Sequence, residues 1–537
     1  MRPLRCAVAS PHVLATATAS ASIRRGGNAI DAAIGAALAL SVVYPHNTSL
    51  GGDLIALVRD VDGSIACLNA SGPASRHADL ATYRGRYGER MPVTGIDTVT
   101  VPGAVAGLGA LHDRGAALSW RDHFVDPLDY AARGVRVARS VAEALEENLT
   151  LIADDAGLSS VYVSGGRTLR EGDVLRQPAL ALTLTALARD GHRSFYEGAV
   201  SERLVRGLAA LGSTIDRDDL AAYRPTWETP LRGSFRHWDV WTSGPNSQGF
   251  NLLQILGALH FLAADCEPLG ADAGVLTELF RAASADRGRA LADPSWVGDQ
   301  VSALLAPEYL SRLAAAARRG GEGAPPSSAP VVRPRGDTVA IVTADDDGRA
   351  VCLIQSLFHS FGSGILEPST GVVLHNRGSS FALSSASLNV LAGGKRPAHT
   401  LMPVMVTTGG ELSWVVGTMG GRAQPQILTQ VLLRLFDGAS PVRALGAPRW
   451  IVGDPDVDQA NEVAWVEAPI TPDVRSAVGP IMSLVEIARH DERTSHAQVV
   501  ARSGDGALSA ASDPRSDGRG VVTAADAATL RGSSADE

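Results

Sequence analysis

The spacing of hydrophobic and polar residues changes beyond the middle of the chain. From residue 104 to residue 319 apolar positions recur mostly at helical spacing, and from residue 339 onward they form short runs separated by turns. The first pattern predicts the helices Ala104–Arg114, Trp120–Arg133, Val141–Leu151, Pro178–Asp190, Gly198–Leu211, Asn251–Leu262, Ala273–Leu291 and Pro307–Arg319, with a strand pair around Gly233–Trp241. The second predicts the strands Val339–Thr343, Ala350–Ser356, Gly371–Leu374, Pro403–Thr408, Leu412–Gly417 and Val463–Ala468, and one long helix over Gln424–Phe436.

The N-terminal part combines an apolar helix with a β-hairpin. The run Ala29–Val43 is rich in Ala, carries Asp31 and falls short of the roughly 20 residues that span a bilayer, so we expect a buried helix. The strand Leu54–Arg59 turns at residues 60–63 and returns over Ser64–Asn69, which is typical of a hairpin. No internal repeat at a solenoid period is found.

Composition narrows the class of protein. The 537 residues are 45% hydrophobic and 20% charged, which is typical of a globular protein. The net charge of −9 argues against nucleic acid as a partner. The four cysteines are far apart and form no CxxC pair, so neither a zinc site nor disulfides are expected. The N-terminus lacks the apolar core of a signal peptide, and we expect a cytoplasmic protein without membrane contact.

A threonine that follows a loop rich in Pro, Gly and Ser is a candidate nucleophile. The loop Gly320–Arg335 leads to Thr338, which opens an alternating apolar strand. A Thr hydroxyl is a poor nucleophile, but cleavage of the peptide bond before it would free an α-amine that can act as its base. That amine titrates at about 7.7–8.0, whereas a Lys amine titrates at about 10.4. The alternatives are an ordinary interdomain linker and an ordinary strand threonine.

About a dozen short motifs, taken in order along the chain, resemble the γ-glutamyltransferase (glutathione hydrolase) family of N-terminal-nucleophile hydrolases. They are residues 26–33 (GGNAIDAA), 51–52 (GG), 101–107 (VPGAVAG), 195–198 (FYEG), 219–223 (DLAAY), 244–249 (GPNSQG), 286–287 (DR), 293–294 (DP), 361–364 (FGSG), 371–376 (GVVLHN), 395–397 (KRP), 420–421 (GG) and 512–515 (SDPR).

The resemblance implies an α+β fold, a four-layer αββα sandwich in which two antiparallel sheets lie between helical layers. It also implies a precursor that cleaves itself into a large subunit, 1–337, and a small subunit, 338–537. The two would remain associated as a heterodimer and form one interwoven domain. A flexible segment at about 320–337 would precede the cleavage site, the Asp337–Thr338 bond.

The resemblance also assigns catalytic roles. Thr338 would attack the Asp337 carbonyl during self-cleavage and the substrate acyl carbon afterwards. Gly420 and Gly421 would present backbone N–H groups to the oxyanion, helped by the helix that follows. Ser356 falls where the family has a second hydroxyl, generally Thr, next to the nucleophile. The competing interpretations are a plain tight turn for the glycines and a solvent-facing strand residue for Ser356.

The positions that hold the γ-glutamyl head group in the family differ here. The Arg that binds the α-carboxylate corresponds to Ser71, and an Asn near the second hydroxyl corresponds to Phe358. After the Asn that corresponds to Asn376 the family has Glu or Gln, whereas this chain has Arg377. The Asp that the family has three positions later corresponds to Ser380 here. The usual Ser-Ser pair is His399-Thr400.

Charge decides what these changes mean. An Arg next to a substrate ammonium is repulsive, whereas a carboxylate there would gain a charge-assisted contact. We therefore expect Arg377 to face an anionic or neutral acyl tail, with further polar contacts from Asn376, Ser380, His399 and Thr400. The alternative is that Arg377 is a structural surface residue.

The sequence thus predicts a self-cleaving Thr-nucleophile enzyme that cleaves γ-glutamyl-like or related amide bonds in a small-molecule acyl substrate through an acyl-enzyme, with hydrolysis favoured over transpeptidation. One alternative is a specialised-metabolism homologue, an acylase or a carbon–carbon bond hydrolase. Another is a homologue that binds without catalysis. No cofactor or metal is expected, because the chain has neither a metal-ligand pattern nor a dinucleotide or phosphate-binding glycine motif.

Overall fold

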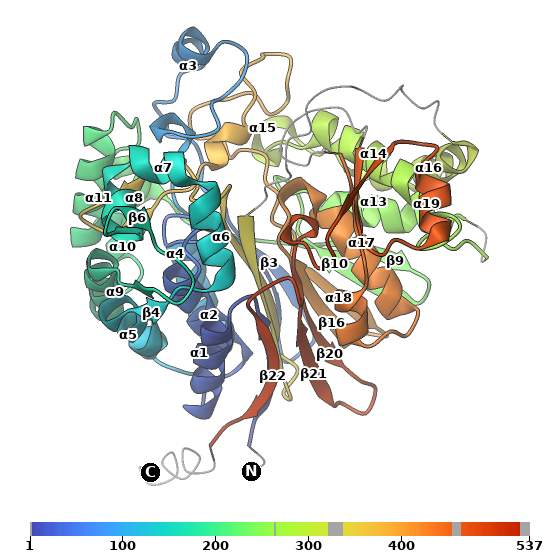
Figure 1. Cartoon of the computed structure of the whole chain (residues 1–537), viewed down its shortest axis with the longest axis horizontal. Coiled ribbons are helices and arrows are strands. Elements are labelled where there is room, and N and C mark those ends of the chain that lie inside the picture. Colours follow the sequence, from blue (N-terminus) through green and yellow to red (C-terminus); the bar gives the residue numbers. More distant parts are fainter. Residues whose placement is uncertain (1–2, 263–264, 321–336, 454–462, 527–537) are drawn as a thin grey trace.

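Two stacked antiparallel sheets form the centre of the molecule, and helices cover both outer faces (Figure 1). The structure is a computed structural model that describes residues 3–262, 265–320, 337–453 and 463–526. In order across the first sheet lie β22 (Arg519–Ala524), β1 (Arg5–Ser10), β11 (Asp337–Asp345), β12 (Ala350–Phe358), β2 (Asp53–Arg59), β3 (Ile65–Ala70) and β8 (Thr226–Glu228). Across the second lie β21 (Leu508–Ser512), β20 (Ala497–Arg502), β16 (Glu411–Thr418), β15 (Val404–Thr408), β10 (Trp238–Thr242) and β9 (Leu231–Phe235).

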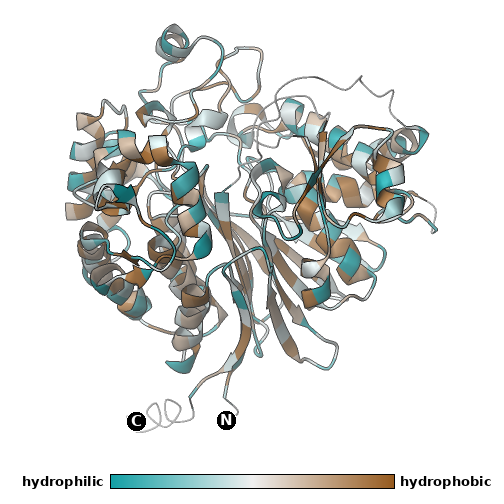
Figure 2. Ribbon diagram, in the orientation of Figure 1, coloured by the Kyte–Doolittle hydropathy of each residue, from teal (hydrophilic) through white to brown (hydrophobic). Residues whose placement is uncertain are grey.

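Alternation along β11 explains why this strand lies between two apolar layers. Ala340, Val342 and Ala344 point toward the second sheet and pack with its Met405 and Val415. The intervening side chains, Val339 and Ile341, pack with the helices on the outer face. Because successive side chains of a strand point to opposite faces, an uninterrupted apolar strand requires cover on both sides. Figure 2 shows the central strands as largely hydrophobic.

Helices from different parts of the chain make the two outer layers. The first sheet is covered by α1 (Val13–Arg24), α2 (Ala29–Val43), α4 (Ala104–Gly115), α5 (Val125–Arg133), α9 (Pro178–Asp190) and α11 (Ala199–Ala210). The second is covered by α13 (Gly249–His260), α14 (Ala273–Ala290), α16 (Pro307–Arg319), α17 (Gln424–Phe436) and α18 (Pro441–Gly446). The αββα sandwich is therefore confirmed.

The remaining elements lie at the rim of this sandwich. They include the helices α3 (Leu80–Tyr87), α6 (Arg139–Glu147), α7 (Leu149–Asp154), α8 (Ala156–Tyr162), α12 (Arg217–Ala222), α15 (Pro294–Val297) and α19 (Pro472–Val478), and a small sheet of β17 (Trp450–Val452), β18 (Val463–Glu467) and β19 (Ser483–Ile487). Within the described residues, no helix combines the length and apolar character needed to cross a bilayer.

Most predicted elements are present, and the differences have local causes. The helices predicted at Ala29–Val43, Pro178–Asp190, Pro307–Arg319 and Gln424–Phe436 have those bounds. The helix predicted over Trp120–Arg133 is instead a 3₁₀ turn, Trp120–Phe124, followed by α5. Pro127 lacks an N–H and fits only in a first helical turn, so the helix restarts just before it. The predicted helix Val141–Leu151 is divided at Asn148 into α6 and α7.

Strands from both sides of the predicted cleavage site alternate in the first sheet. β1 pairs with β11 on one side, and β12 pairs with β2 on the other. The second sheet likewise joins β15 to β10. Two pieces parted between residues 337 and 338 would therefore share both sheets. The predicted flexible segment falls almost entirely on residues 321–336, outside the described residues.

Candidate active site

Thr338 lies at the start of β11, in the middle of the first sheet, and is fully buried. The register between β11 and β12 shifts between Asp337 and Val339, so a bulge lies at this threonine. Bulges re-aim side chains and are frequent next to active sites. The hydroxyl of Thr338 is 2.9 Å from the hydroxyl of Ser356 on β12. Two of the residues predicted as catalytic are therefore in direct contact.

Ser356 also contacts the carbonyl that Thr338 is predicted to attack. Its hydroxyl donates to the Asp337 carbonyl oxygen over 2.7 Å and accepts from the Phe358 N–H over 2.8 Å. Phe358 pairs with Asp337 across the two strands and has a φ of +82°, which is unusual for a residue with a side chain. Nucleophile, second hydroxyl and scissile carbonyl thus form one hydrogen-bonded group, in which Thr338 and Ser356 are buried and Asp337 is partly exposed to the pocket.

Gly420 and Gly421 connect β16 to the 3₁₀ turn Gly421–Ala423 and to α17. Both have positive φ, +112° and +51°, which glycine adopts readily. Within the described part of the chain, neither N–H donates to another backbone or side-chain acceptor. Gly420 and Asp337 line the same pocket. The pair therefore offers unused donors close to the scissile bond, as an oxyanion hole requires.

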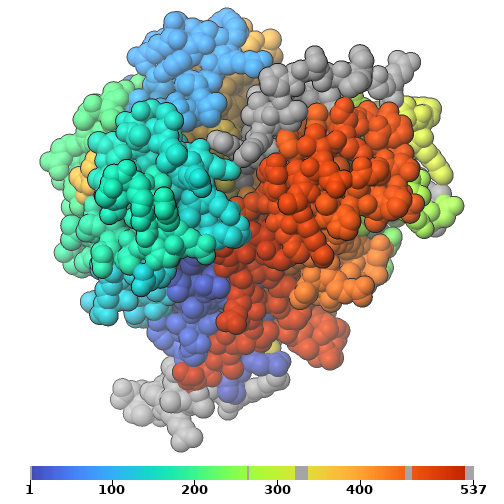
Figure 3. Space-filling view, viewed as in Figure 1, coloured from blue at the N-terminus to red at the C-terminus, as the bar shows by residue number. Residues whose placement is uncertain are grey.

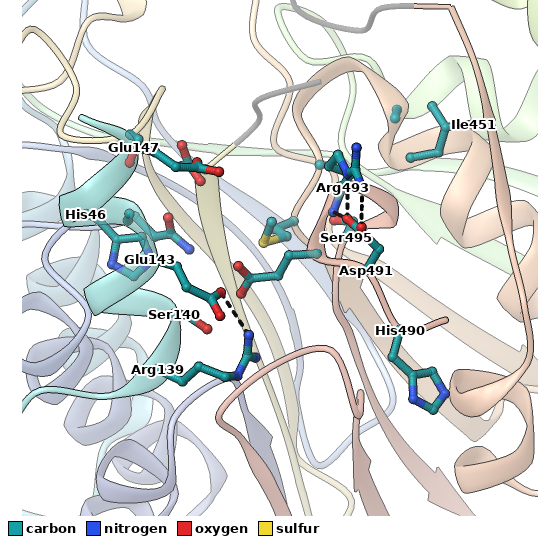
Figure 4. A pocket seen from close by; sticks show the side chains of 18 residues that line it. His46, Arg139, Ser140, Glu143, Glu147, Ile451, His490, Asp491, Arg493 and Ser495 are labelled. Carbon is teal, nitrogen blue, oxygen red and sulfur yellow. Dashed lines mark hydrogen bonds and ion pairs between the residues drawn. The ribbon is translucent and has the colours of Figure 1, made fainter. Parts of the chain in front are cut away.

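The pocket next to the Asp337–Thr338 bond has a volume of about 370 Å³ and is rich in charge (Figure 4). One wall is α6, with Arg139, Glu143 and Glu147, and the other is the segment 490–495 before β20. These two segments, teal and red, face each other across the surface in Figure 3. Arg139 pairs with Glu143 at 2.9 Å, and Arg493 pairs with Asp491.

The Glu492 carboxyl in this pocket has a perturbed pKa. Burial raises the pKa of Glu492 to about 7, against smaller favourable contacts with Ser140 and Arg139. The opposite shift occurs at His46, which lines the same pocket and lies on the side of α6 in Figure 4; burial lowers the pKa of His46 to about 3. At neutral pH the imidazole is therefore uncharged, and the Glu492 carboxyl is close to its midpoint.

Arg377 is fully buried and lies flat on the ring of Phe358, with its guanidinium carbon 3.6 Å from the ring centroid. Its Nη2 donates to the Thr400 hydroxyl over 3.0 Å. Arg377 is thus not a surface residue, and that alternative interpretation is wrong. Phe358, on whose ring the cation lies, pairs with Asp337 across β11 and β12.

His399 belongs to a buried cluster that the sequence did not indicate. Its Nε2 lies 3.1 Å from Asp53, and its Nδ1 accepts the backbone N–H groups of Thr400 and Leu401. Burial and the neighbouring Arg377 lower the pKa of His399 to about 3, so the ring is neutral and Nε2 carries the proton. Although burial alone would raise it, contacts with His375 and His399 hold the pKa of Asp53 below its usual range. Asp53 begins β2 directly opposite Ser356.

The other predicted binding residues make internal contacts. Asn376 donates to the Val93 carbonyl and accepts from the His359 N–H, and Ser380 donates to the carbonyls of Arg377 and Ala398. Ser71 lines a different cavity, formed with Tyr223 and Arg396. Contacts between a substrate and Asn376, Arg377, Ser380, His399 or Thr400 stay predictions.

The residues that sequence reasoning missed are Asp53 and the two walls of the pocket. An acid at the first position of an apolar strand, directly after Gly51-Gly52, was the available signal for Asp53. Nothing in the spacing connects α6 with Glu492, because 344 residues lie between the end of α6 and Glu492. Among the described residues, no group of three or more His, Cys, Asp or Glu side chains is arranged to hold a metal ion.

Comparisons with known proteins agree with this geometry. Residues 15–523 match the family model described as Gamma-glutamyltranspeptidase. The chain is 36% identical over 520 residues to the oxamate amidohydrolase proenzyme of Klebsiella pneumoniae, covering 95% of this chain and 97% of that one. It is 34% identical to the glutathione hydrolase-like YwrD proenzyme of Bacillus subtilis, covering 96% and 98%.

Among solved structures, the cephalosporin acylase from Bacillus halodurans matches with a TM-score of 0.88 and 29% identity, covering 97% of this chain and 96% of that one. The predicted family and fold are thereby confirmed. The chain belongs to the gamma-glutamyltranspeptidase family of self-processing N-terminal-nucleophile hydrolases.

Proposed function

We propose that the protein cleaves itself before Thr338 and then hydrolyses the amide bond of a small, carboxylate-bearing acyl group, through an ester on Thr338. The observation that carries the first part is the contact of the Thr338 and Ser356 hydroxyls beside the Asp337 carbonyl. Once that bond is cleaved, the new α-amine serves as base for the same hydroxyl. Water then resolves the ester.

We expect a small acyl group, because bulky side chains stand at the positions where the family binds the γ-glutamyl head group. Phe358, Arg377, His399 and Thr400 occupy the places where the family holds the γ-glutamyl amine and carboxylate, and all four are buried. The Arg377 guanidinium lies on Phe358 and bonds Thr400, so these side chains fill the space together. A γ-glutamyl group therefore lacks the acidic partners that it needs and would compete for space with four buried side chains.

The charge of the acyl group follows from Arg377. A guanidinium that stacks on the strand partner of Asp337 suits a carboxylate only one or two carbons from the amide carbonyl. Oxamate, the substrate in the name of the Klebsiella pneumoniae relative, has this arrangement. We therefore expect oxamate and other short monoamides of dicarboxylic acids to be better substrates than γ-glutamyl compounds.

Self-cleavage is tested by intact mass spectrometry of the purified protein. We expect two pieces, the smaller beginning with Thr338, and a single uncleaved chain for Thr338→Ala. Thr343→Ala is the matched control, because Thr343 is a buried threonine on the same strand that bonds the Ala29 carbonyl. Cleavage of Thr338→Ala, or no cleavage of the wild type, would refute the proposal.

Substrate class is tested with amides that differ only in acyl length and terminal charge. We expect release of ammonia from oxamate, and at most weak release of aniline from a γ-glutamyl anilide. Phe358→Asn, which restores the residue usual in the family, should raise γ-glutamyl turnover. Arg377→Glu should lower turnover of the carboxylate-bearing amides at least tenfold. If neither variant moves the preference, the assignment of the acyl site is wrong.

A further inference from the structure

The segment just before α13 lies along the loop that contains His399 and Thr400. The His399 N–H donates to the Asn246 carbonyl over 2.7 Å. Gln248 follows two residues later, is fully buried and occupies the N-cap position of α13. An N-cap side chain commonly accepts an N–H of the first helical turn, but within the described structure Gln248 makes no such bond. Its amide instead bonds residues outside its own helix.

The Gln248 amide joins two parts of the proposed site. Its nitrogen donates to the Thr400 carbonyl over 3.0 Å and to the Gly421 carbonyl over 2.8 Å. Its oxygen accepts from Arg287 Nε over 2.8 Å. These partners fix the orientation of the amide, because a carbonyl can only accept and a guanidinium N–H can only donate. One buried side chain therefore holds the loop at Thr400 and the turn at Gly421 at a set separation.

Each of these carbonyls belongs to a residue placed in the proposed site. The Thr400 hydroxyl accepts from Arg377 over 3.0 Å, so Thr400 positions the cation that would bind the acyl carboxylate. Gly421 belongs to the turn that would bind the oxyanion, in which both glycines have positive φ. Glycine changes conformation readily and has no side chain to anchor it, so bonds from neighbouring groups must hold such a turn. Gln248 supplies one of them, and the Gln424 N–H supplies another to the same carbonyl.

We propose that Gln248 is a positioning residue that sets the distance between the carboxylate end and the oxyanion end of the bound acyl group. This deepens the proposed function and rests on it. In oxamate the carboxylate is attached directly to the amide carbonyl, so no rotatable chain can absorb an error in that distance. A misplacement of about 1 Å can lower a rate on the order of 10²-fold. A longer acyl chain adapts by bond rotation, and the bridge through Gln248 therefore favours the shortest acyl groups.

Gln248→Met tests this role, because it keeps the length of the side chain and removes both amide bonds to the carbonyls. Self-cleavage should stay close to the wild-type rate, since the scissile carbonyl accepts from Ser356, and the cleaved product shows that the variant folds. We expect kcat/KM for oxamate to fall on the order of 10²-fold. For succinamate, whose chain is two carbons longer, the fall should be about tenfold or less, so that the preference for oxamate narrows.

The matched control is Gln430→Met. Gln430 is a fully buried glutamine of α17, and its amide nitrogen also donates to two backbone carbonyls, those of Gln426 and Trp450. None of these groups belongs to the proposed site. We expect Gln430→Met to lower thermal stability and to leave the ratio of oxamate to succinamate turnover unchanged.

Gln248→Glu adds a pH profile that a purely structural residue would not produce. An ionised carboxylate can donate to neither carbonyl, whereas the neutral acid can donate to one. The kcat/KM of the variant, divided by that of the wild type, should therefore rise as the pH falls through the pKa of the new carboxyl. The α-amine of the nucleophile titrates in both proteins, so its effect cancels from this ratio.

Three outcomes would overturn the positioning role. They are equal oxamate turnover by Gln248→Met and Gln430→Met, an unchanged ratio of oxamate to succinamate turnover in Gln248→Met, and a pH-independent ratio for Gln248→Glu. All three are measured on cleaved protein. Failure of the proposed function is distinguishable, because it would appear in the wild type as absent cleavage or as no release of ammonia from oxamate.

Discussion

Gly420→Ala should separate turnover from self-cleavage. A Cβ at Gly420 would lie 2.7 Å from Ile427 Cδ1 and 2.8 Å from Ser495 Oγ, closer than real contacts allow. The φ of +112° adds the left-handed penalty of about 1–2 kcal/mol for a residue with a side chain. Overpacking of this kind costs about 1–3 kcal/mol, so the backbone is expected to move.

The movement displaces the N–H groups that would face the oxyanion. Loss of one such donor lowers kcat on the order of 10²–10³-fold, which equals about 2.7–4 kcal/mol. Self-cleavage should change far less, because in the uncleaved chain the Asp337 carbonyl accepts from Ser356. We therefore expect Gly420→Ala to be cleaved within about tenfold of the wild-type rate and then to turn over substrate at least a hundredfold more slowly.

The matched control is Gly438→Ala. Gly438 has a φ of +84° just beyond the far end of α17, and an added Cβ would meet nothing within 4 Å. Gly438→Ala has the same backbone penalty as Gly420→Ala. The two glycines lie about 20 Å apart, because α17 separates them and a helix rises 1.5 Å per residue. Oxamate hydrolysis, thermal melts and gels of both variants complete the comparison. Equal kcat values for the two variants would refute the role given to Gly420.

Two further variants test the buried ionisable groups. Burial raises the pKa of Glu492 to about 7, so the folded protein binds more protons than the unfolded chain between about pH 4.5 and 7, and stability should fall as pH rises through that window. Glu492→Gln should remove this fall and stabilise the protein at pH 8 by on the order of 3 kcal/mol in denaturant melts, and parallel pH profiles would contradict the shift. Asp53→Asn leaves His375 and His399 without their carboxylate and should lower the free energy of unfolding by about 1–3 kcal/mol. The control, Asp347→Asn at an exposed position, should change it by less than about 0.5 kcal/mol. Equal denaturant melts for the two variants would argue against a stabilising role of the cluster.

The fold was largely predictable because its signals are local or belong to family motifs. Periodicity gave α2, α9, α16 and α17 with their bounds, and the threonine after the Pro- and Gly-rich loop indicated the nucleophile. β1 and β20 to β22 were not predicted, since short strands at the ends of a chain gain their stability from pairing with distant partners.

The sequence predicted those parts of the site that lie on two paired strands or that depend on a glycine turn. Thr338, Ser356 and Gly420 lie together as expected. The pocket walls could not be predicted, because α6 and Glu492 meet only through the tertiary fold. The contacts of Arg377 with Phe358 and Thr400 likewise depend on side-chain packing, which sequence spacing does not report.

The edge strand β22 of the first sheet pairs with β1 and so brings the two ends of the fold together, and the Ala525 N–H bonds the Leu4 carbonyl over 2.8 Å. A short linker could therefore join residue 526 to residue 3, and new termini could be opened between 337 and 338. Such a circular permutant would be translated with threonine next to its initiator methionine. Removal of that methionine would expose the threonine amine in one unbroken polypeptide, without any self-cleavage.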